Sequence, residues 1–359
     1  MTVQRQWVRG RGLMLAALLL VASCSHVNPY YDPAKPHHRP DGFQNVDADA
    51  LMPRPFSDFL RWKRESRFLD IPPPQMDLAP VPPDRGLIRL AANHFVVTWI
   101  GHATALVQIG TVRVLTDPHF SERASPVQWA GPKRFQPPGV ALADLPHVDM
   151  VLISHNHYDH LDADSVRALN AQKGRAPLFI VPLGLERWFA GLGITNVRAL
   201  DWWDRVEVAG ATVTLTPVQH WSRRTLTDTN QSLWGGFAVE ARSNDVMRRM
   251  FFTGDTGYSA RHFRDIGERL GPFDLALIPI GAYEPRWFMQ PQHVDPEQSV
   301  QIHRDIRSKF SIGVHWGTFQ LTDEPLDAAV GALAAARTKA GVRDDEFIVL
   351  RHGASKVLD

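Results

Sequence analysis

Four potential metal ligands lie within one short stretch of this 359-residue chain, directly after the apolar segment 150–154. They are His155, His157, Asp159 and His160. Side chains two residues apart in an extended segment point the same way, so His155 and His157 can bind one cation. Asp159 and His160 would face a second cation after the following turn. Imidazole and carboxylate without thiolate favour Zn²⁺, with Fe and Mn as alternatives; a metal-free alternative is a histidine cluster on the surface or in the core.

Ligands from one loop cannot complete two metal sites, and three further candidates occur later in the chain. They are His220, Asp255 and His315, each at the end of an apolar segment. Asp255 follows Gly254, which lets the backbone approach its neighbours closely. A single histidine after a strand is more often structural than a ligand. Taken together and in this order, the candidates predict seven ligands for a pair of metal ions.

Short β-strands and intervening helices must position these residues. Runs of β-branched and aromatic residues predict strands at 94–100, 105–109, 112–116, 150–154, 179–182, 206–208, 212–217, 235–240, 250–254, 275–279, 311–315 and 346–350. Apolar periodicity predicts helices at 57–68, with Ser57 as its N-cap, and at 163–171, 185–192, 258–270, 296–308 and 325–340. This order predicts an α/β fold with a pair of mixed sheets and helices on both outer sides.

The first residues of the chain are typical of export. Residues 1–23 are expected to be a signal peptide, because three arginines precede an apolar run too short to span a bilayer. Cys24, the only cysteine, then stands in a context that resembles the bacterial lipobox. We expect Cys24 to be lipidated and to anchor the protein in a membrane. The alternative is a cleaved signal with an incidental thiol. Because Ser25 is not the aspartate associated with inner-membrane retention, the periplasmic face of the outer membrane is favoured.

Composition limits the remaining chain to an ordinary globular protein. Residues 24–85 are rich in proline and are expected to form a tether and wrapping arm, followed by a single domain over 86–359. The chain has 39 Lys and Arg residues against 38 Asp and Glu, which argues against a nucleic-acid partner. Without a second cysteine, packing and metal must stabilise the fold. The sequence does not indicate an oligomeric state.

Several motifs resemble the N-acyl-phosphatidylethanolamine-hydrolysing phospholipase D family of the metallo-β-lactamase superfamily. They are Gly101-His102-Ala103-Thr104, Leu115-Thr116-Asp117-Pro118, Gly131-Pro132-Lys133-Arg134-Phe135, Gln219-His220-Trp221-Ser222 and His315-Trp316-Gly317-Thr318-Phe319. The resemblance implies a four-layer αβ/βα sandwich of the metallo-β-lactamase type, with 86–359 as the hydrolase domain. It also implies two zinc ions bridged by Asp255. One ion would be bound by His155, His157, His220 and Asp255, and the other by Asp159, His160, Asp255 and His315.

The activity that this resemblance implies is phosphodiester hydrolysis of a phospholipid. A hydroxide bridging two cations would cleave N-acyl-phosphatidylethanolamine into phosphatidic acid and an N-acylethanolamine, with Asp255 essential to catalysis. Metal-assisted hydrolysis alone also fits a lactonase or a non-lipid phosphodiesterase. A zinc-binding lipoprotein without catalysis is a further alternative, although a structural zinc site normally closes with four ligands.

Other residues are expected to support the reaction. Asp117 after a strand is the first candidate partner of a zinc-bound histidine, and the family pattern pairs it with His303 for proton transfer. His293 matches a family histidine near the site, and Tyr158 could contact the substrate phosphate. Trp287, in an aromatic run, is a candidate lipid contact. For each residue the alternative is a purely structural role.

Overall fold

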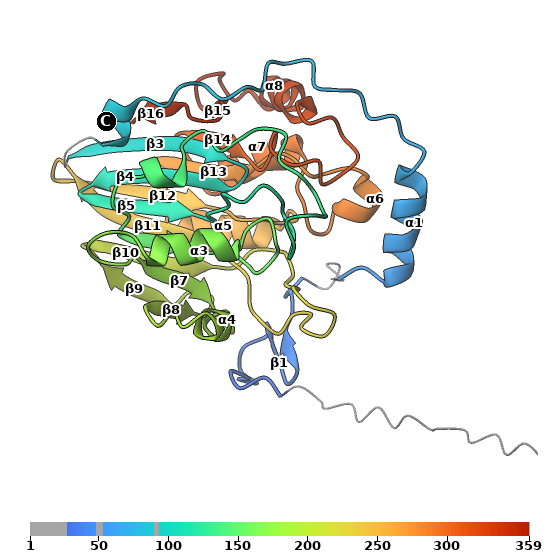
Figure 1. Cartoon of the computed structure of the whole chain (residues 1–359), viewed down its shortest axis with the longest axis horizontal. Coiled ribbons are helices and arrows are strands. Elements are labelled where there is room, and N and C mark those ends of the chain that lie inside the picture. Colours follow the sequence, from blue (N-terminus) through green and yellow to red (C-terminus); the bar gives the residue numbers. More distant parts are fainter. Residues whose placement is uncertain (1–26, 48–52, 90–92, 359) are drawn as a thin grey trace, which may run out of the picture.

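The computed structural model describes residues 27–47, 53–89 and 93–358, which form two seven-stranded sheets packed face to face (Figure 1). The first sheet has the order β16-β3-β4-β5-β6-β7-β8. Its strands are β3 (His94–Gly101), β4 (Thr104–Gly110), β5 (Val112–Thr116), β6 (Met150–Leu152), β7 (Leu178–Pro182), β8 (Val197–Leu200) and β16 (Ser355–Val357). Its central strands are buried on both faces, which explains their continuous runs of apolar residues.

The second sheet has the order β15-β14-β13-β12-β11-β10-β9. Its strands are β9 (Arg205–Val208), β10 (Ala211–Thr216), β11 (Gly236–Ser243), β12 (Val246–Phe252), β13 (Leu275–Pro279), β14 (Ser311–Val314) and β15 (Phe347–Val349). The last two strands of the chain, β15 and β16, join different sheets. The C-terminal segment therefore adds an edge strand to each sheet.

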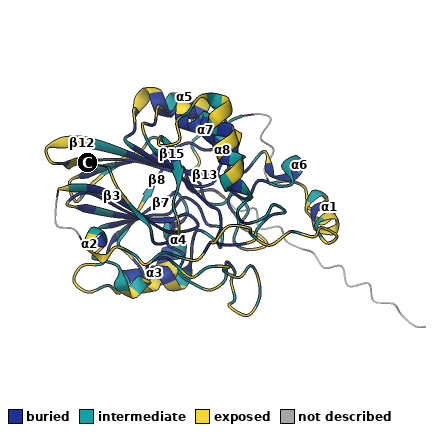
Figure 2. Ribbon diagram, turned by 90° about the horizontal axis from the view of Figure 1, so that it is seen from above, coloured by how far each residue is buried: buried dark blue, intermediate teal, exposed yellow. Residues whose placement is uncertain are grey.

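Helices cover the outer faces of both sheets, as Figure 2 shows from above. The second sheet is covered by α5 (Ala260–Arg269), α7 (Pro296–Asp305) and α8 (Ala328–Ala340), and the first by α2 (Arg85–Ile88), α3 (Ala163–Asn170) and α4 (Glu186–Gly191). The start of α7 follows from its sequence, because Asp295 and Gln298 form a capping box and Pro296 occupies the first turn. The predicted four-layer sandwich is thus confirmed.

Two hydrophobic clusters lie between these layers. The larger contains the facing sides of the sheets and the packing of α5, α7 and α8, including Trp99, Trp234 and Phe263. The smaller lies beneath α3 and α4, where Val166 and Phe189 are buried against the first sheet. Burial of this apolar surface is the main contribution that stabilises the sandwich.

Strand direction determines which residues meet at one edge of the sandwich. In the first sheet β3 and β5 are both antiparallel to β4, and β6 is parallel to β5, so these three strands end at the same edge. In the second sheet β10 and β12 are both antiparallel to β11, and β13 and β14 continue parallel to β12. The loops that follow these strands therefore converge at one edge of the molecule.

The twelve predicted strands and six predicted helices are confirmed, most of them with shifted ends. The prediction omitted β1 (His38–Arg39), β2 (Gly42–Phe43), β8, β16, α2 and α6 (Arg286–Met289), which are short. The predicted N-cap Ser57 is wrong, because α1 (Phe56–Ser66) begins one residue earlier with Pro55 at the cap position and no capping side chain. The signal peptide and Cys24 lie outside the described residues. Over the described part of the chain, no helix has the length and apolar character to cross a membrane.

The segments 27–47 and 53–89 lie on the outside of the sandwich (Figure 1). The indole of Trp62 in α1 donates to Asp323, and the backbone amides of Gln75 and Met76 donate to Asp327. Assignment of residues 24–85 as an arm separate from the hydrolase domain remains a prediction.

A buried charged cluster joins residues 35–38 to the end of β8. Asp201 accepts hydrogen bonds from Lys35, from His37 Nε2 at 2.7 Å and from His38 Nε2 at 2.9 Å. Although burial opposes the change, the hydrogen bonds from His37 and Lys35 hold the pKa of Asp201 well below its ordinary value. The cluster therefore stabilises attachment of this segment at neutral pH.

We predict that Asp201→Ala lowers the free energy of unfolding by about 3 kcal/mol, because the buried Nε2–H donors of His37 and His38 lose their hydrogen-bond acceptor. Asp41→Ala is the control: it breaks an exposed pair with Arg39 and should cost less than about 1 kcal/mol. Denaturant unfolding checks both variants. The contribution of Asp201 should be complete above about pH 4 and decline as the pH falls toward its depressed folded-state pKa. Equal stability of the two variants would contradict this role.

Candidate metal centre

The loop after β6 carries four of the predicted ligands and is fixed from both ends. Its first amide, from Ser154, donates to Asp117 Oδ1 at 2.7 Å, and the amides of His160 and Leu161 turn back to the His157 carbonyl at 3.2 and 2.9 Å. The loop ends at Asp162, which caps α3 by accepting from the Asp164 amide. Strand, turn and helix cap together hold the ligand side chains in place.

Three histidines from two sheets form the first group. His155 Nε2 lies 2.8 Å from His157 Nδ1, which lies 3.3 Å from His220 Nε2. His220 Nδ1 donates to the Gln292 carbonyl at 3.0 Å, and a carbonyl oxygen can only accept. The Nε2 lone pair of His220 therefore points toward the other two rings, as metal coordination requires.

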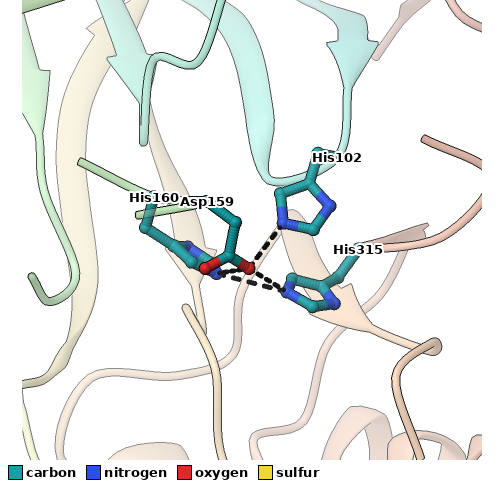
Figure 3. A group of neighbouring side chains, drawn as sticks. All are labelled: His102, Asp159, His160 and His315. Atoms are coloured by element: carbon teal, nitrogen blue, oxygen red, sulfur yellow. Dashed lines mark hydrogen bonds and ion pairs between the residues drawn. The ribbon is translucent and has the colours of Figure 1, made fainter. Parts of the chain in front are cut away.

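A second group lies beside the first and is drawn in Figure 3. Asp159 Oδ2 is 3.2 Å from His160 Nε2 and 3.4 Å from His315 Nε2, and the two histidine nitrogens are 3.2 Å apart. His102 Nε2 approaches the same Asp159 oxygen to 3.0 Å. Asp159, His160 and His315 form the second group and are candidate ligands of one ion, and the ring of His102 lies next to them.

Asp255 lies between the two groups. Its Oδ2 is 3.1 Å from His160 Nε2 and 3.2 Å from His315 Nε2. Its charge also acts on His157 and His220 of the first group, where it partly offsets the effect of burial. Gly254 lets this carboxylate reach its position, because a Cβ there would lie 2.6 Å from the Cβ of Ser154. Asp255 thus has the central place that a bridging ligand needs.

The donor atoms fit cations. Most separations within the second group are 3.1–3.4 Å, which approaches the edge of about 3.3 Å expected for tetrahedral ligands around zinc. Asp255 Oδ1 is buried without a hydrogen-bond partner in the described structure. An unsatisfied buried carboxylate oxygen is costly unless a cation or donor meets it. The chemistry of the donor set therefore matches metal binding.

The histidines of the two groups differ in their protonation. Burial lowers the pKa of His157 to about 4 and that of His220 to about 3, so both rings are neutral at pH 7 and ready to bind metal. Burial also acts on His315, but the carboxylates of Asp255 and Asp159 outweigh it and raise its pKa to about 9. The same carboxylates raise the pKa of His160 well above its ordinary value against the effect of burial.

Asp117 occupies the position expected of a residue that orients a metal ligand. It is buried after β5, with φ at 30°, and accepts from His160 Nδ1 at 2.6 Å and from Ser154 Oγ at 2.5 Å. The first bond leaves His160 Nε2 pointing to the second group. The strained backbone of Asp117 and its buried contacts are typical of a functional position.

The predicted pairing of Asp117 with His303 is wrong. His303 lies in α7, where its Nδ1 contacts Ser311 Oγ at 2.8 Å and its ring stacks on Phe347 at 5.7 Å. Asp117 instead contacts His160, because the strand end of β5 faces the ligand loop. A proton-transfer role for His303 through Asp117 has no support in this geometry.

The three predicted substrate contacts differ in position. His293 and Tyr158 both line a cavity of about 810 Å³ beside the metal groups. His293 Nδ1 is buried without a partner in the described structure, 3.8 Å from Asp255 Oδ2, whereas the Tyr158 hydroxyl donates to the Arg224 carbonyl at 2.9 Å. Trp287 does not line this cavity; it packs beside Trp62 and under the Arg61 guanidinium.

The cavity joins the metal groups to an apolar wall. His157, Asp159 and Asp255 line its polar part. Aromatic and aliphatic side chains line the rest, notably Phe59, Trp62, Trp221, Phe288, Met289 and Leu321. The contribution of α1 to this wall was not predicted, because nothing in a local helical pattern indicates which distant surface the helix covers.

Comparison with known proteins agrees with the site. Residues 112–316, more than half of the chain, match the family described as "Beta-lactamase superfamily domain". The chain belongs to this family. At the level of class, the predicted metal-dependent hydrolase is confirmed, because the relatives include proteins named as hydrolases of this kind.

The chain is more similar to some members of this family than the family match alone indicates. The chain is 46% identical over 233 residues to "N-acyl-phosphatidylethanolamine-hydrolyzing phospholipase D 1" of Caenorhabditis elegans, covering 62% of this chain and 64% of that protein. It is 38% identical over 232 residues to "N-acyl-phosphatidylethanolamine-hydrolyzing phospholipase D, mitochondrial" of Saccharomyces cerevisiae, covering 63% of this chain and 48% of that protein. An uncharacterised Mycobacterium tuberculosis protein is 40% identical over 84% of this chain and 79% of its own length. The predicted resemblance is thus confirmed.

Solved structures confirm the fold. The metallo hydrolase Igni18 from Ignicoccus hospitalis has a TM-score of 0.56 at 20% identity, covering 74% of this chain and 98% of its own. The isothiocyanate hydrolase from Delia radicum gut bacteria has a TM-score of 0.57 at 19% identity, covering 73% and 98%. At these identities the likeness concerns the sandwich alone.

We predict that the purified parent protein binds two metal ions and that Asp255→Asn binds one or none, because a central carboxylate charge is removed. Asp162→Asn is the matched control, because Asn is as good a helix N-cap as Asp and removes the charge of a buried aspartate while keeping the cap of α3. It should keep both ions. Elemental analysis of the two variants checks the prediction, and two ions in Asp255→Asn would contradict it.

Proposed function

We propose that the protein is a binuclear zinc hydrolase that cleaves N-acyl-phosphatidylethanolamine-type phospholipids at the phosphodiester bond, releasing phosphatidic acid and an N-acylethanolamine. One observation carries the proposal: the candidate metal ligands Asp159 and Asp255 line the same cavity as the apolar side chains of α1 and α6. A charged reaction centre beside an apolar wall suits a substrate with a phosphate and acyl chains.

The seven ligands proposed from the sequence would hold the two ions as predicted. When bound, two such cations supply a hydroxide at neutral pH and neutralise charge on a phosphoryl oxygen. The chain's own residues orient this centre. Asp117 fixes the tautomer of His160, and the Gln292 carbonyl fixes that of His220.

Two residues at the cavity are proposed to act on the substrate. Tyr158 is held by the Arg224 carbonyl, with the Arg224 guanidinium 4.1 Å from its ring, which presents the ring to the cavity. His293 has a free buried Nδ1 near Asp255 and can contact the phosphate or the leaving group. Burial lowers the pKa of His293 to about 3, so it is neutral before substrate binds.

The surface near the cavity also suits a lipid substrate. On α1 the side chains of Phe56 and Leu60 are 68% and 53% exposed, and Phe56 lines the cavity. The same helix carries Arg61, Lys63 and Arg64. Exposed apolar residues with basic neighbours favour contact with an anionic membrane surface. We further propose that lipidated Cys24 anchors the exported protein there, with the periplasmic face of the outer membrane as its location.

The substrate proposal predicts selective hydrolysis. The metal-loaded full chain in detergent should release N-acylethanolamine from micellar N-acyl-phosphatidylethanolamine, and Asp255→Asn should lower the rate at least about 100-fold. Mass spectrometry of the products checks this against phosphatidylcholine, a generic phosphodiester and a homoserine lactone. Opening of the lactone alone, or cleavage of the generic diester alone, would contradict the lipid assignment.

The cavity wall gives a second prediction. Phe59→Ser should lower kcat/KM for a long-chain substrate about tenfold, because it removes roughly 1.5 kcal/mol of apolar contact, and should leave a short-chain analogue unchanged. Phe68→Ser is the matched control, since Phe68 is 80% exposed and does not line the cavity. Steady-state kinetics with both substrates decides. Equal losses in the two variants would argue against an acyl-chain wall.

A further inference from the structure

His102 lies in the tight connection between β3 and β4, at the strand edge that carries the metal groups (Figure 3). Its side chain is buried, and its Nε2 is 3.0 Å from Asp159 Oδ2. Its ring centre is 4.0 Å from that of His315. His102 therefore contacts two candidate ligands of the second group from the outside.

Three hydrogen bonds fix the backbone of His102. Its amide donates to Thr318 Oγ1 at 2.8 Å, and its carbonyl accepts from the His315 amide at 2.9 Å and the Trp99 indole at 3.0 Å. Its φ of 53° lies in the left-handed region, which is costly for a residue other than glycine. Three hydrogen bonds thus maintain a strained conformation whose result is to aim the imidazole at Asp159.

We propose that His102 is a positioning residue: its Nε2–H donates to Asp159 Oδ2 and fixes the orientation in which Asp159 binds the second metal ion. The inference rests on the proposed metal centre and deepens it. Through its carbonyl, His102 also holds the backbone of His315, so it aligns two ligands of one ion at once.

The geometry distinguishes this role from that of a metal ligand and from that of a histidine that only fills the core. His102 Nε2 lies at hydrogen-bond distance from an oxygen of Asp159, which is one of the predicted ligands. This contact fits a hydrogen-bond donor that supports a ligand. A core histidine would need no carboxylate partner. The nearby His119 provides the comparison, because it is equally buried and also packs on Phe319, yet its Nδ1 contacts the guanidinium of Arg134 instead of a carboxylate.

The test is metal binding by the full chain carrying His102→Leu, His102→Gln or the control His119→Gln. Zinc affinity is measured by competition with a chromophoric chelator and stoichiometry by elemental analysis. His102→Leu should bind one ion as tightly as the parent and the other about 10–100-fold more weakly. His102→Gln keeps an N–H donor of similar reach and should weaken the second ion less. His119→Gln should match the parent.

Several outcomes would overturn the proposal. Parent-like affinity for both ions in His102→Leu would leave His102 a structural residue. If that variant does not fold, His102→Asn replaces it, because its shorter amide cannot reach Asp159; equal affinities of the Asn variant, the Gln variant and the parent would then overturn the role. With Co²⁺, His102→Gln should keep the parent absorption spectrum, whereas a changed coordination number would make His102 a ligand. A parent that binds fewer than two ions would refute the metal centre itself, which is a separate failure.

Discussion

The structure depends on a concentration of buried charge and imidazole at one edge of two facing sheets. Asp255 is buried, the side chain of Asp159 is only 15% exposed, and both carboxylates lie within 3.4 Å of the same two histidine nitrogens. Burial alone would make two neighbouring carboxylates unfavourable. Positive charge must compensate them, either as protons on His160 and His315 or as metal ions. The fold is stable with its ligands in place only when that compensation is present.

Strand direction turns a linear sequence into this site. The loops after β6, β10, β12 and β14 meet because their strands end at the same edge, although His155 and His315 are far apart in sequence. The segment 53–89 adds apolar side chains beside the metal groups. Its helix α1 forms part of the apolar wall of the cavity, together with Trp221, α6 and Leu321.

The strand-end positions of the predicted ligands could be recognised from sequence, because apolar runs followed by His or Asp indicate where a sheet edge lies. The structure brings all of them together, while their role as ligands remains a proposal. Contacts between side chains were harder to predict. Asp117 was assigned to His303, yet it meets His160, since sequence gives no measure of which neighbour a strand end faces. His102 follows a strand in the same way as Asp117, but its partner depends on the conformation of the β3–β4 turn. The surface on which α1 packs depends on residues far away in the sequence.

The central claim is that the chain binds two metal ions at this edge. Anomalous diffraction from a zinc-loaded crystal, recorded on both sides of the zinc absorption edge, tests it most directly. The account predicts two peaks that share Asp255, one among His155, His157 and His220 and the other among Asp159, His160 and His315, with none at Asp201. A single peak, or peaks elsewhere without one at Asp255, would contradict it.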